Sequence, residues 1–250
     1  MNEIKGKIKE SDFGINLEEM AKVGLNLGHR TSRCHPKMKP YLAGVKNTIN
    51  IIDLEKTAQK LKEALNFIQE IISQNKILLL VGTKIQVKNL VKEIASELGL
   101  PYVNERWLGG TFTNFEVIKK RIDYFKDLEK KLAEGAFEKY TKKERSKIDQ
   151  ELKDFEIKMG GLKNLEKLPD AIFVLDMKKE STAINEAKRK GIKIIAISHT
   201  NVDPTLADYP IPANDDSISS VKYILEKVKQ AMLEAKTKIT ANKETITANK

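Results

Sequence analysis

Residues 170–198, DAIFVLDMKKESTAINEAKRKGIKIIAIS, decide the fold class of this chain. Two continuous apolar runs, 170–176 and 192–198, are typical of strands that are buried on both faces. Between them, residues 180–190 have a helical pattern that ends at Gly191. A strand, a helix and a second strand in this order predict a parallel sheet with a helix packed on its face.

The same pattern continues toward the N-terminus. KILLLVG at 76–82 predicts a strand, and INIIDL at 49–54 predicts an earlier buried strand of β-branched residues. Glu55–Ser73 and Val87–Leu98 have apolar residues at helical spacing. We therefore expect an α/β fold over residues 17–114 and 160–235: a parallel sheet flanked by helices, as in a flavodoxin-like three-layer sandwich.

Residues 115–159 do not fit the alternation, because they are dense in Lys and Glu and contain no strand pattern. Thr141 and Glu144 form a capping box for a second helix within this segment. The spacing predicts a protruding antiparallel coiled-coil hairpin, although two surface helices lying on the main core fit it as well. Its predicted apolar seam comprises Phe115, Ile118, Ile122, Phe125, Leu128, Leu132, Ile148, Leu152, Phe155 and Met159.

The two ends of the chain are expected to contribute little to the core. Residues 1–16 are mixed and polar and predict a flexible segment, followed by a short helix at Leu17–Val23. A C-terminal helix is expected over 216–234. Residues 236–250 repeat ITANK and offer nothing to bury, so we expect a disordered tail there.

Composition restricts the kind of protein. Lys and Arg number 45 against 35 Asp and Glu, which gives a net charge of +10 and favours polyanionic partners. Cys34 is the single cysteine, so no intrachain disulfide can form and a reducing cytoplasm is expected. The longest apolar run, 77–81, is too short to span a bilayer, so no membrane association is expected.

Fragments of catalytic motifs occur, but each is incomplete. LLLVGTK at 78–84 resembles a phosphate-binding loop, yet Ile77 and Ile85 replace the glycine and the hydroxyl residue that this motif requires. Ser198, His199 and Asp203 lie near one another without a nucleophile elbow. We therefore expect no enzyme, no cofactor and no small-molecule substrate. The alternatives are a nucleotide-using α/β enzyme with a degraded phosphate loop and a coiled-coil scaffold that binds no RNA.

The stretch LGHRTSRCHPKMKPYL, residues 27–42, concentrates positive charge on a loop stiffened by prolines. A zinc site of Cys34, His35 and His29 lacks a C-x-x-C pair, and caps and turns explain Asp53, Asp176, Asp203, Asp215 and Asp216 near strand ends, so no metal is expected. Guanidinium and ammonium groups suit phosphate oxygens, although a merely solvated basic loop is the alternative. The candidate RNA-binding residues are His29, Arg30, Arg33, His35, Lys37, Lys39, Lys46, Lys84 and Arg106. Trp107 is expected to be either a core anchor or a base-stacking residue.

Five segments resemble the hallmark segments of the small-subunit ribosomal protein S2 family, in its bacterial form and in the same order. They are GHRTSRCHPKMKPYLAGVKNTINIIDLEKT, LLLVGTK, NERWLGGTFTN, LPDAIFVLD and HTNVDPTLADYPIPANDD, and the resemblance covers residues 17–235. It implies an α/β sandwich with a coiled-coil hairpin, a structural role in the ribonucleoprotein and binding of 16S rRNA at the head–body junction. Neighbouring small-subunit proteins, including ribosomal protein S1, whose docking it would support, are the implied protein partners.

The resemblance has departures. Asn26 and Leu27 stand where the family usually has a His-Phe pair. Cys34 and His35 stand where the family commonly has an aromatic residue before an Asn-Pro-Lys element. His199 stands where an Asp is common, and Ser219 where an Arg is usual. These departures bear on individual contacts and leave the family resemblance intact.

Overall fold

The computed structural model describes residues 13–137 and 139–248. Its centre is a five-stranded, all-parallel sheet with the order β5-β4-β6-β7-β8, which in chain order is 2-1-3-4-5, the flavodoxin-like arrangement. The α/β prediction is confirmed. The strands are β4 (Leu78–Val81), β5 (Tyr102–Val103), β6 (Ala171–Val174), β7 (Lys193–Ser198) and β8 (Tyr209–Pro212).

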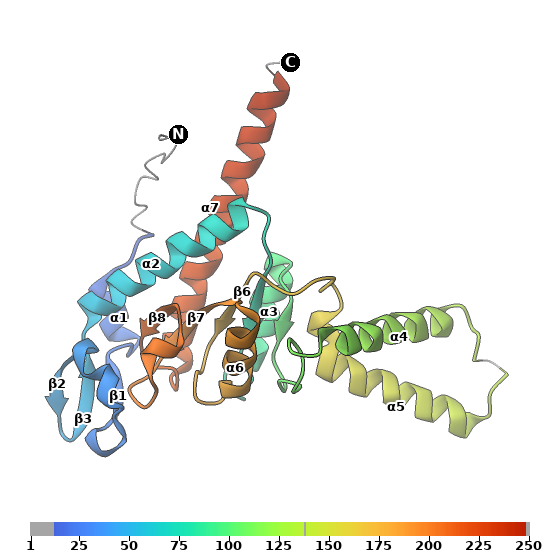
Figure 1. Ribbon diagram of the computed structural model, residues 1–250, viewed down its shortest axis with the longest axis horizontal. Coiled ribbons are helices and arrows are strands. Elements are labelled where there is room, and N and C mark those ends of the chain that lie inside the picture. Colours follow the sequence, from blue (N-terminus) through green and yellow to red (C-terminus); the bar gives the residue numbers. More distant parts are fainter. Residues whose placement is uncertain (1–12, 138, 249–250) are drawn as a thin grey trace.

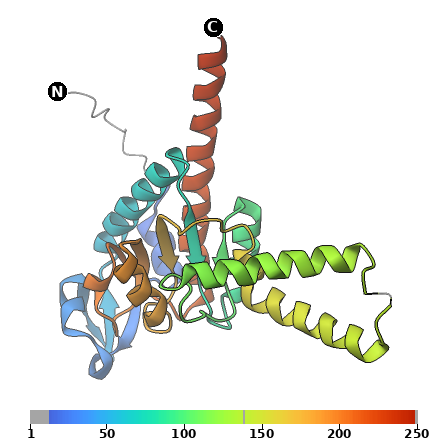
Figure 2. The ribbon, with the colours of Figure 1, turned by 45° about the vertical axis from the view of Figure 1, so that its right-hand side comes forward.

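Helices cover both faces of this sheet (Figures 1 and 2). Leu78 and Leu80 point into a core shared with α2 (Leu54–Ser73), α3 (Lys88–Leu98) and α7 (Ile218–Ala248). Leu79 and Val81 point into a second core beneath α6 (Ser181–Lys190). Successive side chains of a strand face opposite sides, so these strands are apolar throughout. No helix of residues 13–137 and 139–248 combines the length and the apolarity needed to cross a bilayer.

The basic stretch does not form the loop that was predicted. It forms β1 (Leu27–Arg30) and β2 (Leu42–Lys46), which pair antiparallel with β3 (Ile49–Ile52) in the order β1-β3-β2, with short 3-10 turns η1 (Thr31–Arg33) and η2 (Pro36–Tyr41) between them. We call residues 27–52 the small sheet. The prediction that residues 49–54 form a buried strand of the α/β alternation is also wrong. Burial in β3 alternates, with Asn50 and Ile52 buried and Ile49 exposed, as expected for a strand with one covered face.

The predicted hairpin segment forms two helices, α4 (Phe115–Ala133) and α5 (Lys142–Met159), which run away from the body and back (Figures 1 and 2). The capping box of Thr141 and Glu144 is present. Phe125 and Phe155 stack between the helices with ring centroids 5.6 Å apart. Leu132 departs from the predicted seam because its side chain is exposed. A coiled-coil packing of the pair stays a prediction.

The base of the hairpin belongs to the main core. Ile118, Ile122 and Met159 are buried in the same core as Leu79 and Val174 of the sheet. Farther out, Ile148 and Leu152 of α5 are only partly buried. The two helices are therefore anchored where they leave the sheet and are mostly solvated beyond that point.

The ends of the described chain also differ from expectation. Residues 1–12 of the predicted flexible segment lie outside the described residues, but Phe13 is buried and Asn16 caps α1 (Leu17–Lys22). The last helix, α7, continues to Ala248, well past its predicted end at 234 and through most of the predicted tail, while 249–250 lie outside the described residues. Residues 236–248 contain no Pro or Gly, so no strong breaker stops a helix that is already nucleated.

Candidate nucleic-acid interface

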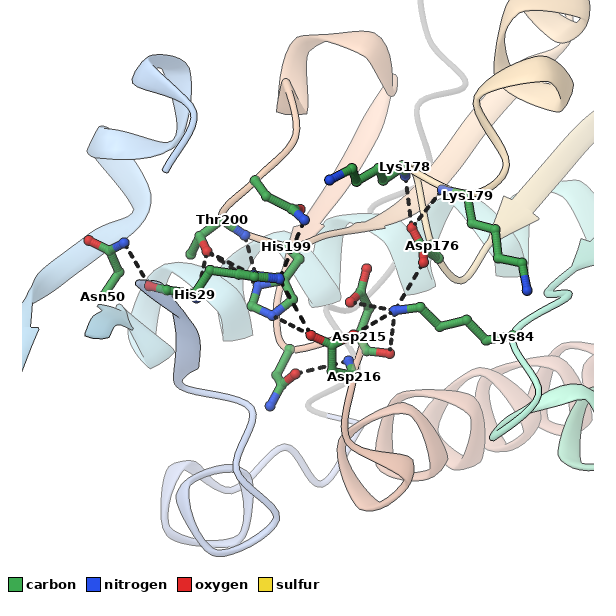
Figure 3. Close-up of polar contacts among 12 residues, drawn as sticks. His29, Asn50, Lys84, Asp176, Lys178, Lys179, His199, Thr200, Asp215 and Asp216 are labelled. Carbon is green, nitrogen blue, oxygen red and sulfur yellow. Dashed lines mark hydrogen bonds and ion pairs between the residues drawn. The ribbon is translucent and has the colours of Figure 1, made fainter. Parts of the chain in front are cut away.

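Lys84 lies at the carboxyl ends of the neighbouring strands β4 and β6. From these ends the chain continues to strands on opposite sides, β5 and β7, and ligands usually bind at this point of the topology. Its Nζ atom is 2.9 Å from a carboxylate oxygen of each of Asp176, Asp215 and Asp216 (Figure 3). Burial alone would lower the pKa of Lys84, because it disfavours the charged ammonium. The three carboxylates, Asp215 foremost, outweigh this effect and raise the pKa of Lys84 above its ordinary value. Lys84, a predicted phosphate contact, is thus engaged in an internal ion network.

The carboxylates of this network outnumber the ammonium that binds them. Asp215 is almost fully buried, and burial, followed by the negative charge of Asp176, raises its pKa to about 7. Asp176 also accepts the backbone N–H groups of Lys178 and Lys179, which orients it at the start of the turn after β6. The crevice therefore holds a surplus of negative charge inside a chain of net positive charge.

Two histidines complete the cluster. His29 comes from β1 and His199 directly follows β7, and their ring centroids are 3.9 Å apart. The Nε2 atoms of His29 and His199 lie 3.5 and 3.6 Å from Asp216 Oδ2 (Figure 3). Burial lowers the pKa of His199 to about 3 and also lowers that of His29, so both rings are neutral at pH 7. His29, another predicted RNA contact, is thus turned inward and uncharged.

Thr200 joins the small sheet to the body. Its hydroxyl accepts the backbone N–H of His29 at 2.8 Å, and its carbonyl accepts that of His35 at the same distance. Asn50 of β3 donates to the carbonyl of His29. Lys37, although exposed, forms an ion pair with Asp203 at 2.6 Å. These directional contacts fix which side chains of the basic stretch can face solvent.

Four cations of the small sheet remain available to a partner. Arg30, Arg33, Lys39 and Lys46 are exposed, and none of them makes an ion pair with any residue that the structure describes. We call these four residues the basic set. The other two predicted contacts of this stretch are already engaged, His35 by capping η2 through its Nδ1 and Lys37 by Asp203. The sequence therefore identified the basic stretch. The structure shows that the basic set comprises its positively charged residues that have no ion-pair partner among the described residues.

Arg106 and Trp107 follow β5, the edge strand farthest from β8. Arg106 is exposed there and separate from the small sheet, which contacts the chain after β7. Trp107 is buried edge-on against Phe112, and its Nε1–H donates to Glu186 of α6. Trp107 is therefore a core anchor, and its burial excludes base stacking.

Glu186 holds the loop around Trp107. Its carboxylate accepts the backbone N–H groups of Gly110, Phe112 and Thr113 in addition to the indole N–H. Burial alone would raise the pKa of Glu186, but these donors outweigh it and hold the pKa below its ordinary value. The sequence offered no signal for this role, because Glu186 lies in an ordinary amphipathic helix.

The catalytic alternatives find no geometric support. Ser198 Oγ contacts Met177 Sδ, so it does not form a triad with His199. Thr83 donates its N–H and hydroxyl to Glu180, which occupies the turn that would have held a phosphate. Asp53 and Asp203 cap α2 and the 3-10 turn η4 (Pro204–Leu206), as the sequence predicted.

Cys34, His35 and His29, which the sequence analysis considered as a zinc site and set aside, do not have metal-ligand spacing. Of the His, Cys, Asp and Glu residues that the structure describes, the one trio with metal-ligand spacing is His29, His199 and Asp216. Cys34 and His35 are not part of it. The sequence partly indicated that this trio would come together, because His199 follows the end of a strand and Asp216 precedes a helix at the same edge of the sheet.

Comparison with known proteins agrees with the fold and its motifs. Residues 20–235 match the family model described as Ribosomal protein S2. The chain is 44% identical over 220 residues to "Small ribosomal subunit protein uS2" of Geotalea uraniireducens, which covers 88% of this chain and 86% of that protein. It is 46% identical over 222 residues to the protein of the same name from Dictyoglomus thermophilum, covering 89% and 90%.

Proposed function

Because the chain belongs to the ribosomal protein S2 family, we propose that it binds 16S rRNA at the head–body junction of the small ribosomal subunit through the basic set. Membership makes it a structural, non-enzymatic protein of the small ribosomal subunit and a component of translation, and it excludes the nucleotide-using enzyme. On this proposal it works in the cytoplasm, beside other ribosomal proteins, and supports the docking of ribosomal protein S1.

One observation carries the RNA proposal: Arg30, Arg33, Lys39 and Lys46 are long, exposed and without a carboxylate partner in the described part of the chain. In contrast, Lys37 of the small sheet is paired within the chain, with Asp203. Arginine and lysine heads held on short strands and turns suit phosphate oxygens, which position a protein on RNA without reading its sequence. His35, Lys37 and Arg106 are assigned secondary contacts. His29 instead holds the small sheet to the body through Thr200, and Lys84 is engaged by Asp176, Asp215 and Asp216.

The test compares two variants that remove the same charge. In the first, the four residues of the basic set are replaced by Gln. In the second, four exposed residues of α4 that form no ion pair with the described residues are replaced by Gln: Lys119, Lys120, Arg121 and Lys126. Filter binding to 16S rRNA across a salt series then separates local contacts from net charge.

Each phosphate contact contributes a slope of about −0.7 to −0.9 in log affinity against log salt. The basic-set variant should therefore lose roughly three units of slope and enter small subunits poorly in cells, while the α4 variant keeps both. Equal losses in the two variants would mean that net charge acts without a defined surface. If the basic-set variant kept the wild-type affinity, salt slope and incorporation, the small sheet would not be the RNA-binding surface.

A further inference from the structure

The hairpin of β2 and β3 in the small sheet has one face that points away from the body. Asn50 and Ile52 of β3 are buried on the body side, so the alternate residues Ile49 and Ile51 belong to the outer face. Both strands lie at the outer rim of the molecule, on the side away from α4 and α5 (Figure 1). This outer face is therefore open to a partner.

One row of residues across the outer face places an apolar side chain between two cations. Ile49 pairs with Arg30 of β1 on one side and with Lys46 of β2 on the other. Residues directly opposite each other in antiparallel strands share a face, and strands two apart are separated by about 10 Å. Neither cation has a carboxylate partner among the described residues. The row can therefore receive two anionic groups with apolar surface between them.

The next row contains a glycine that the chain itself does not require. Gly44 pairs with Ile51, whose other neighbour is Leu27 of β1. The φ angle of Gly44 is not positive, and a Cβ atom added to it would meet no atom within 4 Å. The register shifts between Leu42 and Gly44, but a bulge needs glycine only at a positive φ. Glycine weakens a strand, and one of its uses there is the close approach of a ligand.

The tip of the hairpin shows the opposite anomaly. Asn47 and Thr48 connect β2 to β3 and both have positive φ, 49° and 65°. Such a turn is most often Asn-Gly, and a β-branched residue at positive φ is strained. The carbonyl of Thr48 accepts the N–H of Thr31 at 2.9 Å, which holds the tip beside η1. The Thr48 side chain is exposed, and strain of this kind is concentrated at functional sites.

The chemistry of the outer face suits the minor groove of double-stranded RNA. That groove is wide and shallow and displays riboses and 2′-hydroxyl groups between phosphates. Single-stranded RNA is instead read by stacking its bases on aromatic side chains, and the one Phe, Tyr or Trp of the small sheet, Tyr41, is partly buried. A second copy of this chain would place cations against cations. Duplex RNA is therefore the partner that the face fits best.

We propose that the outer face of the β2–β3 hairpin packs against the minor groove of an RNA duplex. Arg30 and Lys46 contact phosphates, and Ile49 packs on ribose carbon atoms between them. The Thr48 hydroxyl bonds a 2′-hydroxyl, and Gly44 lets the groove approach the strand backbone. This contact rests on the proposed function, because both cations belong to the basic set. It adds the class of RNA and two residues outside that set.

The experiment uses the full chain freed of RNA and three fluorescent probes of one sequence: an RNA duplex of about 16 base pairs, its single strand and the DNA duplex. Fluorescence anisotropy at one salt concentration gives the affinity for each probe. Gly44→Val and Thr48→Gly are the test variants, because neither changes the charge, and thermal melts confirm that each folds. The chain supplies matched controls. Gly109→Val fills an equally open glycine near Trp107, and Asn75→Gly replaces another residue of positive φ, 54°.

We expect the RNA duplex to bind more tightly than the single strand or the DNA duplex. Gly44→Val should weaken duplex binding by at least about 10-fold, because a branched side chain holds the groove away from both cations. Thr48→Gly should weaken it by about 2- to 10-fold, the effect of one hydrogen bond. Its melting temperature should stay near that of wild type, since relief of strain offsets the added flexibility of glycine. Gly109→Val and Asn75→Gly should bind as wild type does.

Three results would overturn this contact: tightest binding to the single strand, equal binding to the RNA and DNA duplexes, or wild-type binding of the RNA duplex by either test variant. If the basic-set variant nevertheless lost 16S rRNA, the proposed function would stand without the contact. If the basic-set variant kept wild-type binding, the proposed function would fail as well. Normal RNA binding by Gly44→Val together with poor entry into small subunits would mean that an acidic protein segment occupies this face instead.

Discussion

The small sheet and the helical hairpin extend from one α/β body but are attached to it by different forces. The hairpin buries Ile118, Ile122 and Met159 among the side chains of the sheet. The small sheet buries Met38 and Ile52, yet neither belongs to the two main cores, and it meets the body through hydrogen bonds at Thr200. Apolar attachment tolerates small shifts, whereas hydrogen bonds fix distance and direction. The small sheet is therefore held by contacts that define its direction, which suits the phosphate-binding surface that we propose for it.

The largest effect is expected where the hairpin enters the core. Ile122→Ala removes a fully enclosed side chain and should lower the free energy of unfolding by about 2–5 kcal/mol, measured by chemical denaturation. Leu132→Ala on the same helix is the control, because that side chain is 43% exposed, and its cost should stay within roughly 1 kcal/mol. If Ile122→Ala lowered the free energy of unfolding as little as Leu132→Ala does, the base of the hairpin would contribute nothing to the core.

A smaller effect is expected at Glu186. The amide of Glu186→Gln cannot accept hydrogen bonds at both ends, so some of the N–H donors of Gly110, Phe112 and Thr113 lose their partner. We expect a loss of about 1–3 kcal/mol in unfolding free energy at pH 7, against little change for exposed Glu166→Gln.

The pH dependence of the same variant checks the cause. The folded pKa of Glu186 lies below its ordinary value of 4.5, so the unfolded chain takes up the proton first. The stabilisation is therefore complete above pH 4.5 and is lost as pH falls below it. Denaturation curves across this range should bring wild type and Glu186→Gln together, and a constant gap would contradict the carboxylate's role.

The smallest effect is expected at the ion pair of the small sheet. Lys37 and Asp203 are 2.6 Å apart, but the lysine is more than half exposed, so a double-mutant cycle of Lys37→Gln and Asp203→Asn should give a coupling of about 0–1 kcal/mol. High salt should reduce it further. A coupling well above this range would mean that charge, and not the hydrogen bonds at Thr200, holds the small sheet.

The same contrast explains what could be predicted from the sequence. Continuous apolar runs identified the parallel strands β4, β6 and β7, and helical periodicity identified the segment 115–159. The sequence analysis missed β5, which is two residues long, and β8, whose Pro210 and Pro212 obscure an edge strand. It also missed the pairing of β1 with β3. It identified the cations of the basic stretch, but not that His29 turns inward, since that depends on Thr200 and Asp216 nearly two hundred residues away. Glu186 and the histidine cluster likewise depend on tertiary position alone.

The position of α7 has a consequence for biosynthesis. This last helix covers the core that begins at Phe13, and the hydroxyl of its Tyr223 accepts the N–H of Asn16. Gln69 of α2 likewise donates to the carbonyl of Ala231. A polypeptide emerges N-terminus first, so α2 and α3 can pack on this face of the sheet before α7 does, and the part of the face that α7 covers stays exposed until α7 has left the exit tunnel. The core that α2, α3 and α7 share is therefore completed only after α7 has emerged, and part of its apolar surface stays exposed until then.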